Sequence, residues 1–371
     1  MKTQLALVKC DNYDFNLVYN SVKRAIELLG GIEKFIKPEA KVLIKPNLLQ
    51  AVSPQQAVTT HPILVKAVIK ILKGIKCKIY LGDSPSSWFK VVNFEELYAR
   101  CGMKTIAEEE SIELVDFKHP VWKNNFPLTN YLDFCDYFIS LPKFKTHELT
   151  ILTAAVKNLF GLVCGVYKIE LHRRYLKKED FCKMLIDLYE VAKPHLTIVD
   201  GIVSLEGDGP GTSGIPKNTG FILAGVDCIA IDSILALIMG LKPLDILTNL
   251  EAKRRGLGIT ELKDIEILGD KLEEFLNMNF KLPATSLIKK VPLPILEIAK
   301  KMIRFYPKIK PDKCVLCGNC VRICPVKAMT IKNKKVRVDH SKCISCFCCQ
   351  ETCLYSAINI KTTILAKIIG L

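Results

Sequence analysis

The 371-residue sequence lacks the segments that would direct a chain out of the cell, across a membrane or onto nucleic acid. Its first residues, MKTQLALVKCDNYD, have too short an apolar stretch and too early an aspartate for a signal peptide. The most apolar segment, residues 221–241, includes Asp227 and Asp232, each of which would cost about 2.5 to 3.5 kcal/mol inside a bilayer. No nucleic-acid recognition motif or aromatic platform is interleaved with the lysines. We therefore expect a cytoplasmic protein that does not bind nucleic acid, with a strand, a polar turn and a buried helix in residues 221–241.

Acidic side chains are scarce in the last quarter of the chain. Residues 1–280 hold 35 basic and 34 acidic side chains, whereas residues 281–371 hold 18 and 4, so +14 of the net charge of +15 lies there. The asymmetry indicates a separate C-terminal unit. The first 280 residues are enough for one large domain or two lobes with a real hydrophobic core.

Cysteine, in contrast, is abundant, and eight of the 16 cysteines form a repeated pattern. The spacing C-x2-C-x2-C-x3-C occurs from Cys314 to Cys324, followed by Pro325, and again from Cys343 to Cys353. In a two-cluster pattern each quartet gives three thiolates to its own [4Fe-4S] cluster and its fourth to the other. We therefore predict two clusters, one on Cys314, Cys317, Cys320 and Cys353 and the other on Cys343, Cys346, Cys349 and Cys324. A zinc site would leave the third cysteine of each triplet without a use.

These last 50 or so residues resemble the bacterial 2[4Fe-4S] ferredoxin module, with two departures. Leu354 stands where the pattern has proline, and this predicts a change in solvent access, and hence in potential, at one cluster. Cys348 is a spare thiol beside the ligand Cys349, and we interpret it as a small packed residue. The other seven cysteines have no metal spacing and are typical of free thiols in a reducing compartment.

Residues 1–280 alternate short β-branched runs with amphipathic segments, which predicts an α/β domain with an open, mostly parallel sheet. The expected strands are 5–8, 41–44, 78–81, 137–141, 197–199 and 221–223. The expected helices are 19–29, 62–73, 94–101, 149–160, 183–191 and 230–239. A basic amphipathic linker, residues 281–311, should lead to a small α+β ferredoxin domain, residues 312–361, and an apolar tail, residues 362–371. Linker and tail could lie on an anionic membrane surface or bind a partner, but internal packing is the more common use of such segments.

Polar residues follow several of the expected strands, and in a parallel sheet these ends lie on one edge. They are Lys45 and Asn47, Asp83 and Ser84, Lys143, Lys145 and His147, and Asp200. Each alone could be a turn residue. Two lysines within three residues beside a histidine are harder to explain in this way, so we expect a crevice for an anionic ligand.

The segment after this cluster predicts a helix from Leu149 to Phe160, with Thr146 as a possible N-cap. Thr150, Thr153 and Lys157 would share one face of it. Lys157 could then join the cationic crevice, to which the helix N-terminus would add a positive field. The alternative is that Lys157 extends to water.

Short motifs from residue 45 to residue 232 resemble those of a known family. They are Lys45-Pro-Asn, Gly82-Asp-Ser-Pro-Ser, Lys143-Phe-Lys-Thr-His, Lys157-Asn-Leu-Phe-Gly, Asp200-Gly, Glu206-Gly-Asp-Gly-Pro-Gly and Ala224-Gly-Val-Asp-Cys-Ile-Ala-Ile-Asp. In this order they resemble domain of unknown function 362, a family of uncharacterised Fe-S centre proteins often fused to a ferredoxin module. The resemblance covers about residues 40 to 235 and implies an anaerobic redox setting without a defined reaction.

Two further segments have open interpretations. Gly209, Gly211 and Gly214 spell G-x-G-x-x-G, but the prolines in and after the motif and the absence of a following helical run argue against a dinucleotide site. We interpret this segment as a mobile loop over the crevice. His172, Arg173 and Arg174 could supply an acid and an anion clamp, or could form a solvated basic face.

Together these features predict an iron-sulfur oxidoreductase that relays low-potential electrons through two [4Fe-4S] clusters to an anionic small molecule or bound cofactor. Lys143, Lys145 and Lys157 would stabilise negative charge, and His147 would donate a proton. Asp83 and Asp200 would orient groups or bind an additional metal ion. The expected ligand-binding residues are Lys45, Asn47, Ser84 and Asn158.

The sequence also bears on cofactors, on partners and on alternative functions. An organic cofactor is possible, although no reliable flavin or nicotinamide motif is present. A redox partner protein is expected. The alternatives are a non-catalytic electron carrier or adaptor, and an enzyme without redox chemistry whose clusters are structural or sensory.

Overall fold

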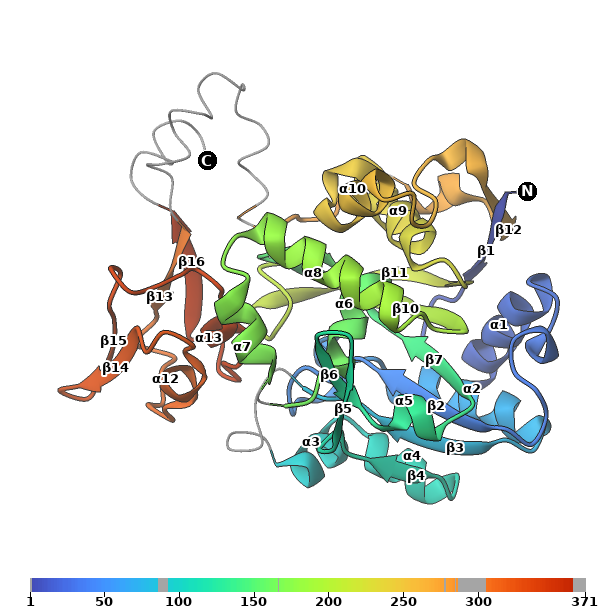
Figure 1. Cartoon of the computed structure of the whole chain (residues 1–371), viewed down its shortest axis with the longest axis horizontal. Helices are drawn as coiled ribbons and strands as arrows, with labels where there is room; N and C mark the ends of the chain where they lie inside the picture. The colour runs from blue at the N-terminus through green and yellow to red at the C-terminus, as the bar shows by residue number, and fades with distance from the viewer. Residues whose placement is uncertain are drawn as a thin grey trace.

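The computed structural model describes residues 2–85, 93–165, 167–276, 278–283, 285 and 305–362. A ten-stranded mixed sheet runs through the N-terminal part, in the order β12-β1-β11-β10-β7-β2-β3-β4, and β8 and β9 branch from β10 (Figure 1). Its strands are β1 Thr3–Lys9, β2 Lys41–Pro46, β3 Lys78–Gly82, β4 Glu113–Val115, β7 Tyr137–Leu141, β8 Lys143–His147, β9 Ile151–Thr153, β10 Leu196–Gly207, β11 Gly214–Gly225 and β12 Ile265–Gly269.

Most pairings in this sheet are parallel. Strands β10, β7, β2, β3 and β4 run parallel to one another, and so do β1 and β12, whereas β11 is antiparallel to both β1 and β10. The carboxyl ends of the parallel strands therefore lie on one edge, as in other α/β sheets. The predicted α/β class is confirmed.

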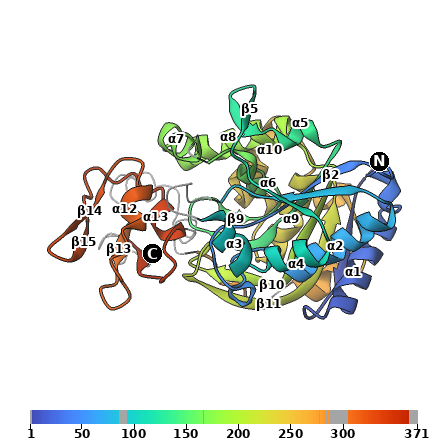
Figure 2. The same cartoon turned by 90° about the horizontal axis from the view of Figure 1, so that it is seen from below.

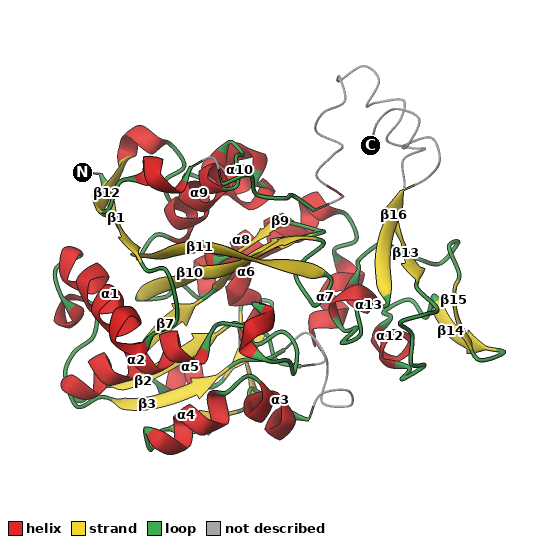
Figure 3. Cartoon of the chain, turned by 180° about the vertical axis from the view of Figure 1, so that it is seen from behind, coloured by secondary structure: helices red, strands yellow, loops and turns green. Residues whose placement is uncertain are grey.

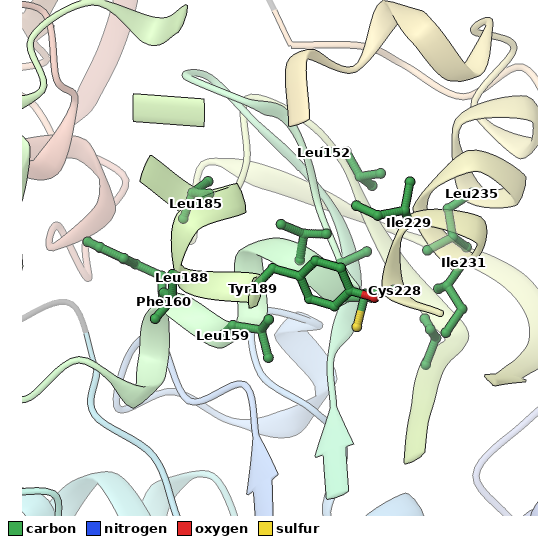
Figure 4. Close-up of a cluster of buried hydrophobic side chains, with 14 of the residues drawn as sticks. Leu152, Leu159, Phe160, Leu185, Leu188, Tyr189, Cys228, Ile229, Ile231 and Leu235 are labelled. Atoms are coloured by element: carbon green, nitrogen blue, oxygen red, sulfur yellow. The ribbon is translucent and has the colours of Figure 1, made fainter. Parts of the chain in front are cut away.

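Helices cover both faces of the sheet (Figure 3). One hydrophobic core contains apolar residues of α1 Phe15–Leu28, α2 Pro62–Gly74, α3 Phe94–Arg100 and α4 Met103–Glu109. The other contains those of α6 Ala155–Asn158, α8 Lys178–Val191, α9 Cys228–Ile238 and α10 Leu247–Arg254. Figure 4 shows part of this second core, where the ring of Tyr189 of α8 lies beside Cys228 of α9.

Some of these helices begin at a side chain that caps their first backbone amides. The Asp14 carboxylate accepts from the amide of Leu17 at the start of α1, and Asp227 accepts from two amides at the start of α9. A capping carboxylate satisfies N–H groups that have no partner inside the helix. Because Asp227 caps α9, residues 221–241 form the expected strand, polar turn and buried helix.

Short elements complete the domain. They are β5 Pro120–Lys123, β6 Phe126–Thr129, α5 Tyr131–Phe134, α7 Tyr167–Arg174 and the 3-10 turns Ile32–Lys34, Pro54–Gln56, Leu159–Leu162, Pro243–Asp245, Leu262–Asp264 and Leu272–Phe275.

The predicted helix from Leu149 to Phe160 is wrong. Strand β9, Ile151–Thr153, pairs antiparallel with β8, and only the short helix α6 follows it. The β-branched residues Ile151 and Thr153 fit a strand better than a helix. Thr146 lies within β8 rather than at an N-cap, and no helix N-terminus adds its field at this point.

The C-terminal unit, residues 305–362, lies at one end of the molecule (Figures 1 and 2). It contains β13 Phe305–Ile309, α12 Asn319–Ile323, β14 Met329–Lys332, β15 Lys335–Val338, α13 Cys348–Glu351 and β16 Ile358–Thr362. Strand β13 pairs with β16, so residues 305–309, expected in the linker, form part of this unit. We call residues 305–362 the ferredoxin-like module.

Most of the expected linker, residues 281–311, lies outside the described residues, and so does the tail after residue 362. Within the described part of the chain, no helix has both the length and the apolar character needed to span a bilayer.

Candidate functional site

A cavity lies where the module meets the carboxyl edge of the sheet. Its volume, measured as the space that the centre of a water molecule can occupy, is about 50 Å³. One water needs about 10 to 15 Å³ on this measure, so the cavity has room for a few waters or one small anion. Its charged and polar lining residues are Asn47, Asp83, Ser84, Lys145, His147, Thr153, Lys157, Asn158, Lys168, His172, Cys348 and Glu351.

Strand β8 supplies two of these side chains. Lys143, Lys145 and His147 alternate along the strand and therefore share one face, because side chains in a strand alternate between its two sides. Lys145 and His147 line the cavity, whereas Lys143 does not.

Lys143 belongs instead to a buried network. Its Nζ donates to the Asp200 carboxylate at 2.9 Å and to the Tyr13 hydroxyl at 2.8 Å, and Tyr13 donates to Asp200 at 2.7 Å. Asp200 also accepts from the amide of His61 at 2.8 Å. A buried ion pair of this kind keeps its charges satisfied internally. The expectation that Lys143 and Asp200 contact a ligand therefore has no support in the geometry.

A second buried pair joins Lys45 to Asp83, and Asp83 lines the cavity. Lys45 Nζ lies 2.8 Å from Asp83 Oδ1 and donates to Asn158 Oδ1 at 3.0 Å, and the amide of Leu48 donates to Asp83 Oδ2 at 2.7 Å. Gly161 packs so closely on this pair that a Cβ there would lie 2.2 Å from Asp83 Oδ1. Lys45 is fully buried and does not line the cavity, so the expectation that it binds a ligand directly is also unsupported.

Asn47, Ser84 and Asn158 do line the cavity. Part of their polar capacity is used within the protein, since Asn158 Nδ2 donates to Ser140 Oγ at 2.9 Å and Ser84 Oγ accepts from the amide of Gly165 at 3.1 Å. These three residues shape the cavity and hold its charged neighbours in place.

Three cavity lysines have no carboxylate within ion-pair distance in the described structure. Lys145 donates to the carbonyl of Val58 at 2.7 Å, and Lys168 donates to the carbonyl of Ser84. Lys157 lies over the rings of Phe160 and Phe181, at 4.8 and 5.7 Å from their centroids. Burial lowers the pKa of Lys145 and Lys157, and it lowers the pKa of Lys168 to about 7. An anion in the cavity would offset this desolvation and favour the charged form of each lysine.

Glu351 of α13 brings a carboxylate from the module into this cationic cavity. Its Oε1 lies 3.2 Å from His147 Nε2, while His147 Nδ1 accepts from the amide of Leu149 at 3.0 Å. Nδ1 is therefore unprotonated and Nε2 carries the proton toward the carboxylate. Burial lowers the pKa of His147, which agrees with a neutral ring. Burial alone would raise the pKa of Glu351, but the contact with His147 and the charge of Lys157 outweigh it and hold the pKa at about 2.

His172 lines the cavity from α7 and stacks on Phe181, with ring centroids 4.7 Å apart. Burial lowers its pKa to about 3, so it is neutral near pH 7. Arg173 pairs with Glu170 at 2.8 Å on an exposed surface, and neither Arg173 nor Arg174 lines the cavity. Of the two interpretations of these arginines, the geometry favours the solvated basic face over an anion clamp.

The module is held against the α/β domain by polar and apolar contacts. Gln350 Nε2 donates to the carbonyl of Asp208 at 3.2 Å, and Thr212 Oγ1 donates to the carbonyl of Cys353 at 2.8 Å. Leu354 packs on a buried cluster that includes Val58 and Leu205. The residue that departs from the ferredoxin pattern is thus a docking residue.

The glycine-rich segment joins β10 to β11, a strand-to-strand connection rather than the strand-to-helix turn of a dinucleotide site. Pro210 of this segment lines the cavity, and Gly209 lies against Thr146 so closely that a Cβ would come within 2.5 Å of its carbonyl oxygen. The segment therefore covers the cavity.

The eight patterned cysteines line two further cavities in the module. One is lined by Cys314, Cys317, Cys320 and Cys353 and the other by Cys324, Cys343, Cys346 and Cys349. These are the quartets expected from the sequence, and we call them the outer and the inner quartet. The fourth cysteine of each motif accepts from a backbone amide four residues on, at 3.1 Å from Ala328 to Cys324 and at 3.3 Å from Ala357 to Cys353. Thiolates of iron-sulfur clusters accept such N–H···S bonds, so these residues fit two [4Fe-4S] clusters.

The expected additional metal ion has no matching group of ligands. In the residues that the structure describes, no three His, Cys, Asp or Glu side chains converge closely enough to hold a single ion. Asp83 and Asp200 are each committed to a lysine.

Sequence reasoning missed Glu351 and Lys168. Glu351 lies between two patterned cysteines and is the one acidic residue from Cys343 to Cys353, a signal that could have been noticed. Lys168 has no motif or spacing in the sequence that distinguishes it from the exposed lysines.

Fold and site together define an iron-sulfur protein in which a ferredoxin-like module closes a cationic cavity in a larger α/β domain. The chain belongs to the family described as Domain of unknown function (DUF362), which it matches over residues 42–236, and residues 306–354 match the 4Fe-4S dicluster domain. The predicted family and its fusion to a dicluster module are confirmed, so the chain carries an iron-sulfur domain of the electron-transfer type.

Two known proteins are similar to this chain. The Thylakoid-associated protein sll1697 of Synechocystis sp. is 31% identical over 267 residues, which cover 70% of this chain and 82% of that protein. The lactate racemase apoprotein from Thermoanaerobacterium thermosaccharolyticum is 14% identical, with a TM-score of 0.38, over 61% of this chain and about half of that structure, 54%.

Proposed function

We propose that this protein is an iron-sulfur oxidoreductase that delivers electrons from the ferredoxin-like module to a small anion held in the cavity. One observation carries the proposal: helix α13 contains Cys349 of the inner quartet and also places Cys348 and Glu351 in the wall of the lysine-rich cavity. The bound clusters would supply one electron each. A small molecule bound in the cavity would therefore contact a helix that also carries a cysteine of the inner cluster.

The two quartets differ in their relation to the cavity. Ile323 and Cys348 line it, and each precedes a cysteine of the inner quartet, Cys324 or Cys349, in sequence. In the outer quartet Cys317 is exposed to solvent. This supports a path in which electrons arrive at the outer quartet and leave from the inner one.

The cavity lysines would hold the anion. Among the described residues, Lys145, Lys157 and Lys168 have no carboxylate within ion-pair distance, whereas Lys45 and Lys143 are neutralised by Asp83 and Asp200. Preorganised cations in a site shielded from water stabilise negative charge that develops as a substrate is reduced. The small volume favours an anion with few non-hydrogen atoms over a nucleotide.

His147 and Lys168 are the candidate proton donors. His147 Nε2 lies 3.2 Å from Glu351 Oε1, and the pKa of Lys168, lowered by burial to about 7, suits proton transfer near neutral pH. Lys143, first expected at the reacting centre, would instead hold β8 in place through Asp200.

Re-oxidation of reduced clusters tests the proposal. The anaerobic holoprotein is reduced with a stoichiometric photoreductant and mixed with a panel of small oxyanions and carboxylates, and cluster absorbance is followed. We expect one class of anion to re-oxidise the clusters at least tenfold faster than buffer, and Lys157→Met to remove that effect while keeping the cluster spectrum. Lys178→Met, an exposed lysine at the start of α8, is the matched control.

Two results would reject this function. Turnover of an anion that continues without any reductant would point to an enzyme with structural or sensory clusters. Re-oxidation by protein electron acceptors alone, with no anion effect on the EPR spectrum of the clusters, would point to a carrier or adaptor.

We place the activity in the cytoplasm, because the seven cysteines outside the module are buried free thiols, which supports a reducing compartment. The similar Synechocystis protein is named for an association with thylakoids. Tests of this protein should therefore include anionic lipid vesicles.

A further inference from the structure

The outer quartet has an exposed apolar wall. Val315, Leu316 and Tyr355 line its cavity and are 56%, 36% and 47% exposed. Ile331, 44% exposed, lies beside the same loop, since a Cβ on Gly318 would be 3.9 Å from its Cδ1. Large apolar side chains gathered on one exposed face indicate a binding surface.

The inner quartet has no such wall. Phe347, Met329 and Ala328 line its cavity and are 5%, 3% and 2% exposed. The four large apolar side chains that are well exposed in the described module are all those beside the outer quartet. The exposure is therefore specific to one cluster site.

Basic side chains predominate in the module that carries this apolar patch. Residues 305–362 hold eleven lysines and arginines against three acidic residues: Glu351 is buried in the cavity, Asp339 pairs with Lys342 at 3.4 Å, and Asp312 is exposed. Arg322 lies over the loop of the outer quartet, where its Nη2 donates to the carbonyl of Cys317 at 3.1 Å. Lys334 and Lys335 are exposed at the turn between β14 and β15.

The β14–β15 hairpin lies on the side of the module that faces away from the α/β domain in both views (Figures 1 and 2). A partner could therefore reach the patch without displacing the contacts that close the cavity.

We propose that this face, formed by Val315, Leu316, Ile331 and Tyr355 within a basic rim, is the docking surface for a small acidic electron-transfer protein. An apolar centre with a charged rim is the usual organisation of a transient interface. A basic rim steers an acidic partner and speeds its encounter. The inference rests on the proposed function for the direction of electron flow, and it adds the place and the charge of the electron donor.

Stopped-flow reduction of the oxidised holoprotein tests the surface without any substrate. The probe is an acidic flavodoxin in its hydroquinone form, whose flavin absorbance is distinct from that of the clusters. Photoreduced 5-deazaflavin, which needs no protein docking, is the comparison reductant. We expect Leu316→Asp to lower the second-order rate constant with flavodoxin at least tenfold and to leave the rate with deazaflavin unchanged. Leu262→Asp changes a similarly exposed leucine, 47%, on the α/β domain and should have no effect.

The charge of the rim is tested separately. The double variant Lys334→Glu with Lys335→Glu should lower the flavodoxin rate several-fold at low ionic strength, and the difference should shrink as salt is added because salt screens exposed charges. Lys263→Glu with Lys271→Glu is the control on the far domain.

The proposal is overturned if Leu316→Asp behaves like Leu262→Asp, or if the wild-type rate rises with salt. It is also overturned if Lys334 and Lys335 mediate sedimentation with anionic vesicles while flavodoxin reacts no faster than deazaflavin. The cavity variant Lys157→Met should accept electrons from flavodoxin like the wild type. A failed docking test and a failed anion test can therefore be told apart.

Discussion

His147 Nε2 of the α/β domain lies 3.2 Å from Glu351 Oε1 of the ferredoxin-like module. The two residues are 204 positions apart in sequence and are both buried. Since the contact joins β8, the strand that carries the cavity lysine Lys145, to α13, the helix that carries the cluster cysteine Cys349, it couples module docking to the charge of the cavity. The cavity has this arrangement only when the module is in place.

Glu351→Gln should strengthen the binding of a small anion. The pKa of Glu351 is held at about 2, so its charge is present at every pH used for activity and opposes an anion among the lysines. Removing one charge a few ångströms away at an effective dielectric constant near 20 is worth more than about 1 kcal/mol. We expect the affinity for sulfate, measured by anaerobic calorimetry, to rise about tenfold.

Glu170→Gln provides the matched control, because Glu170 is an exposed carboxylate on nearby α7 that does not line the cavity. An unchanged or weaker affinity in Glu351→Gln would show that this carboxylate does not face the bound anion.

Anion binding should depend on pH through Lys168. Burial lowers the pKa of this lysine to about 7, so its charge is present below that pH and is lost above it. Sulfate stays a dianion throughout this range, so any change reports on the protein. We expect sulfate affinity to fall as pH rises from 6 to 8.5, and Lys168→Met to bind about tenfold more weakly at pH 6 with a flatter profile. A profile that keeps its slope in Lys168→Met would assign the titration to another group.

The sequence predicts six of the ten strands of the sheet, because these contain short apolar runs followed by polar residues, and it does not predict β4, β8, β9 and β12. It fails at residues 149–160, where apolar spacing fits a helix over the whole segment and the pairing of Ile151 and Thr153 with β8 is decided by tertiary contact. It also underestimates the length of β10 and β11, which continue beyond the expected runs and pair with each other from Val203 opposite Asn218 to Gly207 opposite Gly214.

The site was predicted in part for a similar reason. Strand-end position indicates that Lys143 and Lys145 are close together, but only the packing shows that Lys143 is neutralised by Asp200 while Lys145 faces the cavity. Glu351 enters the site through the docking of the module, and no local pattern encodes that docking.

Leu354→Pro should weaken docking without loss of the clusters. The substitution restores the proline of the ferredoxin pattern, so cluster assembly should be unaffected, but it removes a side chain that packs on Val58 and Leu205. Loss of a partly buried leucine contact costs about 1 to 2 kcal/mol. We expect iron content to stay at the wild-type level and amide hydrogen exchange around Thr212 to rise. Tyr355→Ala, the exposed neighbour, should leave exchange there unchanged, and equal exchange in both variants would contradict a docking role for Leu354.

Cys348 and Cys349 are adjacent, but only Cys349 lines the inner quartet cavity, whereas Cys348 lines the cavity of the lysines. Cys348→Ser should therefore retain about eight irons per chain, and Cys349→Ser should lose up to about four, since each [4Fe-4S] cluster needs four protein ligands. Iron and sulfide analysis of the two variants after anaerobic reconstitution measures this difference. Full iron retention in both variants would mean that either thiol can serve as a ligand. Full retention in Cys348→Ser with a changed response of the EPR spectrum to anions would place this thiol beside the bound anion, between the cavity and the inner cluster.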